Sequence, residues 1–105
     1  MSTRVVLCKP SELPHGTARR FDVAGARIAL VHTGDEFHAV DDRCSHEDYS
    51  LAEGEVWEDE CEIECPRHGS TFDLRTGSPC SLPATQPVPV YPLEIADGKV
   101  AVILP

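Results

Sequence analysis

Apolar and polar residues alternate over short stretches of this chain, and no window keeps the 3.6-residue spacing of an amphipathic helix. Stretches of about five residues bounded by Gly, Asp or Pro are typical of antiparallel strands joined by tight turns. The pattern predicts strands over residues 3–7, 19–23, 27–32, 36–41, 56–58, 61–64, 71–74, 91–95 and 99–104. We therefore expect an all-β fold of roughly eight to ten short strands, a number that the turn spacing suggests.

Two segments do not fit this alternation. Residues 80–92 contain four prolines, which cannot donate to a sheet ladder, so we expect an extended covering segment or an edge strand there. Residues 48–54 are expected to form a connection with at most one short turn. We see no repeat, low-complexity tract or linker, and we expect a single domain over residues 1–105.

Length and charge narrow the possible environments of the protein. The longest apolar runs, such as residues 100–104, are far too short to cross a bilayer, and no signal-peptide pattern is visible. We therefore expect a soluble cytoplasmic protein. The net charge of −9 argues against nucleic acid and anionic membranes as partners.

The acidic residues are concentrated in one stretch. Nine of the 18 acids lie between His46 and Cys65, where the chain has no lysine or arginine. This stretch is either a solvated face that keeps the protein soluble or a docking surface for a positively charged redox partner. The nine acids are Glu47, Asp48, Glu53, Glu55, Glu58, Asp59, Glu60, Glu62 and Glu64.

Two short segments combine cysteine with histidine. Cys44-Ser45-His46 is followed, after eighteen residues, by Cys65-Pro66-Arg67-His68. A structural zinc site more often pairs cysteine with cysteine and histidine with histidine. The mixed halves suit a binuclear centre with both thiolates on one iron and both imidazoles on the other. A structural Cys₂His₂ zinc module remains the alternative for these four residues.

The remaining cysteines and histidines have no such spacing. The five cysteines are an odd number without a secretory signal, which argues against a disulfide framework. We expect three of them to be ordinary reduced thiols, buried or partly so, and three histidines to be ordinary strand or surface residues. These are Cys8, Cys61, Cys80, His15, His32 and His38. Trp57 is expected to pack beneath the cluster hairpin, with a contact to a partner protein as the alternative.

The pattern C-x-H…C-x-x-H, continued by Gly69-Ser70-Thr71-Phe72-Asp73, resembles the Rieske-type ferredoxins that serve aromatic-ring dioxygenases. The resemblance implies an antiparallel β-sandwich with a small cluster-binding subdomain of two loops, about residues 42–73. It also implies one [2Fe–2S] cluster held by Cys44, His46, Cys65 and His68. Pro66 and Gly69 would shape the second loop.

The implied function is electron transfer rather than catalysis. A carrier of this family takes one electron from a flavin-containing reductase and passes it to a terminal Rieske oxygenase. Small Rieske chains also serve as nitrite reductase subunits or occur near iron–sulfur assembly genes, and these alternatives remain open.

Two features of the loops bear on the reduction potential: the bracing disulfide and the hydroxyl donors to sulfur. In the respiratory Rieske proteins the two motifs are similar to C-x-H-x-x-C and C-P-C-H. The two extra cysteines form a disulfide that braces the loops. Those positions are Tyr49 and Arg67 here, so that disulfide cannot form. Ser70 is retained as a donor to sulfur, but Phe72 replaces a tyrosine donor. The resemblance therefore predicts the low-potential class, roughly −150 mV.

Overall fold

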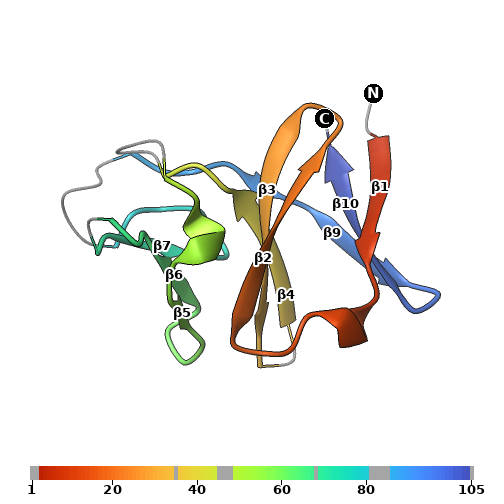
Figure 1. Ribbon diagram of the computed structural model, residues 1–105, viewed down its shortest axis with the longest axis horizontal. Coiled ribbons are helices and arrows are strands. Elements are labelled where there is room, and N and C mark those ends of the chain that lie inside the picture. The colour runs from red at the N-terminus through yellow and green to blue at the C-terminus, as the bar shows by residue number, and fades with distance from the viewer. Residues whose placement is uncertain (1–2, 35, 45–48, 68, 81–85, 105) are drawn as a thin grey trace.

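The computed structural model describes residues 3–34, 36–44, 49–67, 69–80 and 86–104. These residues form ten short strands and two 3-10 turns, arranged in three antiparallel sheets (Figure 1). The all-β prediction is confirmed. The elements are β1 (Thr3–Cys8), η1 (Pro10–Glu12), β2 (Thr17–Val23), β3 (Ala26–Thr33), β4 (Glu36–Asp41), η2 (Leu51–Glu53), β5 (Val56–Trp57), β6 (Glu62–Glu64), β7 (Thr71–Asp73), β8 (Val90–Tyr91), β9 (Leu93–Ala96) and β10 (Lys99–Leu104).

Strand β3 lies between two hydrophobic cores. Ile28 and Leu30 pack in one core with Val100 and Val102 of β10, which joins the sheet β2-β3-β4-β8 to the sheet β1-β10-β9. The alternate residues of β3, such as Val31, pack in the second core. Successive side chains of a strand point to opposite faces, so a strand covered on both sides is apolar at every position. This explains the fully buried run of residues 28–31.

The third sheet, β5-β6-β7, stands beside the sandwich and completes the second core (Figure 1). Ile63 of β6 and Phe72 of β7 are paired across the ladder and are fully buried. The proline-rich segment connects this sheet to the sandwich, because Val88 N–H donates to Gly77 O at 2.8 Å and Asp41 N–H donates to Pro89 O at 2.8 Å. The prediction of an edge strand is correct for β8, which lies at the edge of its sheet.

Three expectations need correction. The single strand predicted over residues 91–95 is two strands, because Pro92 separates β8, which pairs with β4, from β9, which pairs with β10. Trp57 does not pack beneath its hairpin: it lies on the surface, and its Nε1 donates to Glu64 Oε1 at 3.3 Å. Cys80 is exposed, whereas Cys8 and Cys61 are buried as expected.

The part of the chain that the structure describes contains no helix with the length and apolar character of a membrane span.

Candidate metal centre

Two loops, one after β4 and one between β6 and β7, begin at a cysteine and are closed by the same kind of backbone hydrogen bond. The N–H of Cys44 donates to Tyr49 O at 3.0 Å, and the N–H of Cys65 donates to Ser70 O at 2.7 Å. Each bond spans five residues, so loop 44–49 and loop 65–70 are closed hairpin loops of equal length. His46 and His68 belong to these two loops but lie outside the described residues.

Both cysteines are buried in the same hydrophobic core. Cys44 is 1% exposed and Cys65 is fully buried, and both belong to the core that contains Phe72 and Leu74. Neither cysteine is part of a disulfide. Two thiols brought from separate loops into one buried apolar core fit the sulfur half of a binuclear iron centre, because the thiolate is the ligand form of cysteine.

Asp42 fixes the start of loop 44–49. Its backbone N–H donates to Arg27 O on β3 at 3.0 Å, and its own C=O accepts the N–H of Leu51 at 2.6 Å. Its carboxylate oxygen Oδ1 accepts the N–H of Ala52 at 2.9 Å. The residue before the loop and the turn after the loop are therefore tied together and to the sandwich.

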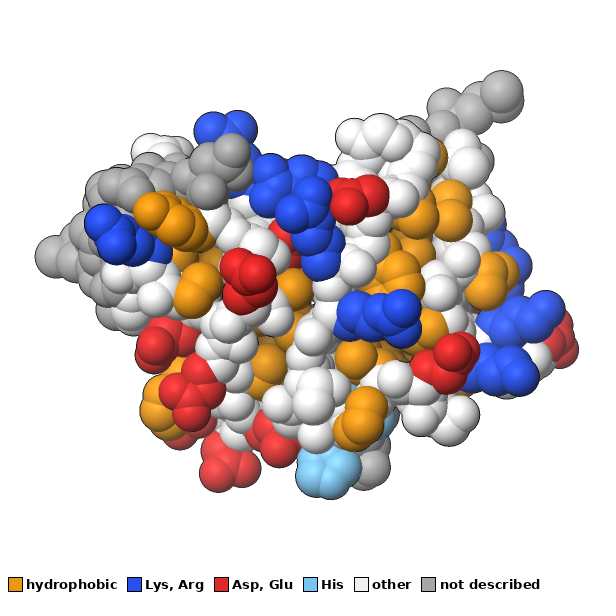
Figure 2. All heavy atoms as spheres, in the orientation of Figure 1, with side chains coloured by type: hydrophobic (Ala, Val, Ile, Leu, Met, Phe, Trp, Pro, Cys, Tyr) orange, Lys and Arg blue, Asp and Glu red, His pale blue; other side chains and the backbone are white. Residues whose placement is uncertain are grey.

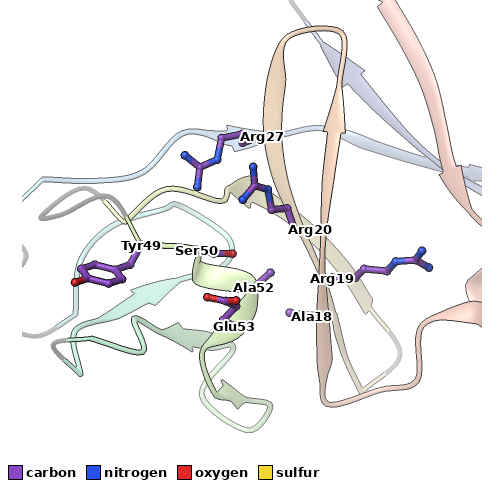
Figure 3. A pocket seen from close by; sticks show the side chains of 8 residues that line it. All are labelled: Ala18, Arg19, Arg20, Arg27, Tyr49, Ser50, Ala52 and Glu53. Carbon is purple, nitrogen blue, oxygen red and sulfur yellow. The ribbon is translucent and has the colours of Figure 1, made fainter.

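The Asp42 carboxylate is a buried charge with several partners. Its Oδ2 accepts the Ser50 hydroxyl at 2.7 Å, and it lies 3.7 Å from both Arg20 Nε and Arg27 Nη2. Figure 3 shows both arginine side chains reaching from β2 and β3 toward Ser50, at an open pocket of about 550 Å³. The two ion pairs with these arginines, together with the hydrogen bonds from the Ser50 hydroxyl and the Ala52 N–H, compensate the cost of burying the carboxylate.

Loop 65–70 is the turn of the β6–β7 hairpin. Glu64 pairs with Thr71 at its base, and inside the loop the N–H of Gly69 donates to Cys65 O at 3.0 Å. Gly69 has φ +74°, a left-handed conformation that side chains disfavour. Ser70 is fully buried next to this glycine. Pro66 lies in the turn that follows Cys65. The role of Pro66 and Gly69 in shaping a cluster-binding loop stays a prediction.

Gly54 brings the two loop regions into close contact. It ends the turn η2 that follows loop 44–49, and a Cβ at this position would overlap the carbonyl oxygen of Glu64, immediately before Cys65. Glu64 N–H donates to Glu55 O at 2.9 Å in the same region. The absence of a side chain at Gly54 lets the segments that carry Cys44 and Cys65 approach each other.

Sequence reasoning missed Asp42 and Ser50. Their polar character was visible, but Asp42 stands in the polar run Asp41-Asp42-Arg43, where nothing indicates that the Asp42 carboxylate is fully buried and the Asp41 carboxylate only partly. Burial raises the pKa of the Asp41 carboxyl, an effect opposed by Arg27. Only the packing of η2 against β2 and β3 identifies Asp42 as the residue that holds the loop.

Cys61 and His38 form a separate contact on the other side of the second core. Cys61 Sγ lies 3.5 Å from His38 Nε2, which is 3.2 Å from Glu36 Oε2. Burial raises the pKa of the Cys61 thiol and lowers the pKa of His38. In the part of the chain that the structure describes, no three His, Cys, Asp or Glu side chains are grouped so that they could hold a metal ion.

The fold and the two cysteine loops define a class of small β-proteins that hold an iron–sulfur centre at one end of a sandwich. The chain belongs to the Rieske [2Fe–2S] domain family, whose model matches residues 3–92. Its cofactor is accordingly one Rieske-type [2Fe–2S] cluster.

Known relatives narrow the class further. The chain is 41% identical over 102 residues to the 3-phenylpropionate/cinnamic acid dioxygenase ferredoxin subunit of Escherichia coli K12, covering 97% of this chain and 94% of the relative. The ferredoxin of carbazole 1,9a-dioxygenase from Nocardioides aromaticivorans IC177 superposes with a TM-score of 0.92 at 35% identity, covering 95% and 96% of the two chains. A carbazole 1,9a-dioxygenase ferredoxin, solved in complex with its oxygenase, matches at 40% identity with a TM-score of 0.87, covering 94% and 91%. These relatives are electron-transfer components, and the chain is a Rieske electron carrier rather than an enzyme.

Proposed function

We propose that Cys44 and Cys65 bind one iron of the cluster and that His46 and His68 bind the other. The observation that supports this assignment is the equal closure of loops 44–49 and 65–70, each of which places a buried cysteine in the same core. When bound, a Rieske-type cluster supplies reversible one-electron transfer. The surrounding residues exclude water from the thiolate side and fix the two loops.

We propose a low reduction potential for this carrier. Hydrogen bonds to the sulfurs stabilise the reduced state and raise the potential. Phe72 is fully buried and has no hydroxyl, so it offers no such bond, whereas Ser70 keeps its hydroxyl. The chain therefore lacks one of the two side-chain donors that the resemblance to respiratory proteins calls for.

We propose that the protein accepts an electron from a flavin-containing reductase and passes it to the terminal oxygenase of an aromatic-ring dioxygenase system, as a single domain in the cytoplasm. The names of the relatives support this, because they are dioxygenase ferredoxin subunits and one was solved together with its oxygenase. If the chain were instead a nitrite reductase subunit or a carrier in iron–sulfur assembly, it would pass its electron to a nitrite reductase or to an assembly protein.

The ligand assignment is tested by EPR of the reduced protein combined with a redox titration of the parent and of His46→Cys and His68→Cys. We expect the parent to show a Rieske-type spectrum and each variant to change it, because a thiolate replaces an imidazole at one iron. A colourless parent with one zinc per chain, or variant spectra identical to the parent's, would refute the assignment. The partner assignment is tested by reconstituting NADH-driven transfer through a dioxygenase reductase to its oxygenase, with a nitrite reductase as the competing acceptor.

A further inference from the structure

A cation–π contact joins the two cysteine loops. The guanidinium carbon of Arg67 lies 5.7 Å from the centroid of the Tyr49 ring, within the reach of about 6 Å for such contacts. Arg67 belongs to loop 65–70, and Tyr49 closes loop 44–49 through its carbonyl oxygen. The contact therefore connects two segments that are far apart along the chain.

We propose that Arg67 and Tyr49 form a non-covalent brace that keeps the two cluster loops together. The inference rests on the proposed function, because it takes both loops to carry ligands of one cluster. Asp42 ties together the residues just outside loop 44–49, and Gly54 lets the neighbouring segments approach. Arg67 is the third residue of its loop, so the brace acts further out, between the loops themselves.

The orientation of Tyr49 supports this role. Figure 3 shows its side chain extending away from Arg20 and Arg27, although all three residues line the same pocket. Among the contacts between rings and cations in the described residues, the ring of Tyr49 pairs with Arg67 from the opposite loop. Tyr49 is 37% exposed, so the nearby guanidinium also covers part of an aromatic ring that otherwise faces solvent.

The brace occupies the two positions at which the resemblance to respiratory proteins places a disulfide. Disulfides persist mainly in oxidising compartments, whereas a cation–π contact between a guanidinium and a phenol ring is insensitive to reduction. A carrier that works among reductants can therefore use this contact to hold its loops without a bond that reduction would break.

The expected consequence is slower loss of the cluster. The cluster leaves only when its two loops separate, and an exposed cation–π contact opposes that separation by an amount equivalent to about two- to fivefold in rate. Arg67→Gln removes the cation and Tyr49→Leu removes the ring. Each should accelerate cluster loss by this factor, while Arg67→Lys and Tyr49→Phe, which keep a cation and a ring, should stay close to the parent.

The experiment is a double-mutant cycle on the purified cluster-containing protein. The rate of decay of the visible absorbance in the presence of an iron chelator is measured for the parent, for Arg67→Gln, for Tyr49→Leu and for the double variant. If the two residues act as one brace, the double variant loses its cluster no faster than the faster single variant. Arg19→Gln is the matched control, because it removes a cation–π contact of 5.1 Å with Phe21 within β2 and should leave the decay unchanged.

Two results would overturn the brace. One is a decay rate unchanged in both single variants, and the other is effects that simply multiply in the double variant, which would mean that the residues act independently. Failure of the proposed function is recognised separately. In that case the parent would contain no iron, or the His68→Cys variant would have the same spectrum as the parent. A brace failure instead leaves a normal parent spectrum together with an uncoupled cycle.

Discussion

The Ser50 hydroxyl donates a 2.7 Å hydrogen bond to Oδ2 of Asp42 across the base of loop 44–49. Because Asp42 is fully buried and charged, loss of this donor leaves part of a carboxylate unsatisfied. We expect Ser50→Ala to lower the free energy of unfolding by about 1.5–3 kcal/mol, the range for hydrogen bonds to charged groups. Chemical denaturation followed by circular dichroism measures this, with the exposed Ser11→Ala as a control that should cost little. Equal denaturation midpoints for Ser50→Ala and the parent would contradict the role of this bond.

Gly54 provides a test of how closely the two loop regions must approach. Its backbone has ordinary dihedral angles, so Gly54→Ala should act only through the overlap of the new methyl group with the Glu64 carbonyl oxygen. We expect a cost of about 1–3 kcal/mol from overpacking and a lower cluster content per purified chain. Iron and sulfide analysis measures the cluster content.

Gly25→Ala is the comparison for that substitution. Gly25 has φ +80° and no atom within 4 Å of the position that a new methyl group would take, so its replacement strains the backbone by about 1–2 kcal/mol without a clash. It lies in the β2–β3 turn, away from the loops, and should leave the cluster content unchanged. If both variants lose iron equally, the effect of Gly54→Ala reflects general destabilisation rather than the separation of the loops.

The strands and the C-x-H…C-x-x-H motif could be predicted from the sequence, because both depend on the spacing of residues along the chain. The hairpin at Gly34 and the strand Glu36–Asp41 follow directly from alternation and turn residues. The proposed ligand residues are recognisable in the sequence because Cys44 and Cys65 each stand near a histidine. By contrast, Asp42, Gly54 and the contact between Arg67 and Tyr49 depend on which segments meet in space. The periodicity of the sequence does not indicate such contacts between distant segments. For the same reason it does not indicate that the chain passes from one sheet to another at Pro92.

Phe72 provides a test of the proposed low reduction potential. Phe72→Tyr adds a hydroxyl at the position where the resemblance places a donor to sulfur, so the reduction potential should rise. A hydrogen bond to a charged group is worth about 1.5–3 kcal/mol, and both oxidation states accept it, so only the difference counts. We expect a rise of about 60 mV or less, since 59 mV corresponds to a tenfold change for one electron. Protein-film voltammetry measures the shift. Phe21→Tyr, a partly buried position in the other core, is the control and should not change the potential.

His38 should make stability depend on pH. Burial lowers its pKa, an effect that Glu36 only partly opposes, so the folded state binds a proton less readily than the unfolded state. As the pH falls below about 6.5, the unfolded chain takes up the proton first and stability declines. We expect His38→Asn to show a shallower fall in denaturation midpoint between about pH 7.5 and 5.5 than the parent. Identical slopes for parent and variant would show that His38 is not involved.

The acidic stretch gives the last prediction, about docking. Figure 2 shows acidic side chains gathered on the side of the molecule that holds the third sheet. Asp59 lies in the β5–β6 turn and Cys65 follows β6, so one three-residue strand, about 10 Å, separates the turn from loop 65–70. This is close to one Debye length at physiological salt, so the charge can act at the cluster end of the molecule only while salt is low.

If the stretch steers a basic redox partner, Asp59→Lys should slow bimolecular electron transfer several-fold at low salt and flatten its salt dependence. Glu94→Lys changes the net charge by the same amount, but Glu94 lies on β9 in the β1-β10-β9 sheet. This control should have a much smaller effect. Stopped-flow rates with the reduced partner, measured across a salt series, separate the two interpretations. Parent rates that do not fall as salt rises, or equal effects of the two substitutions, would mean that the stretch is only a solvated face.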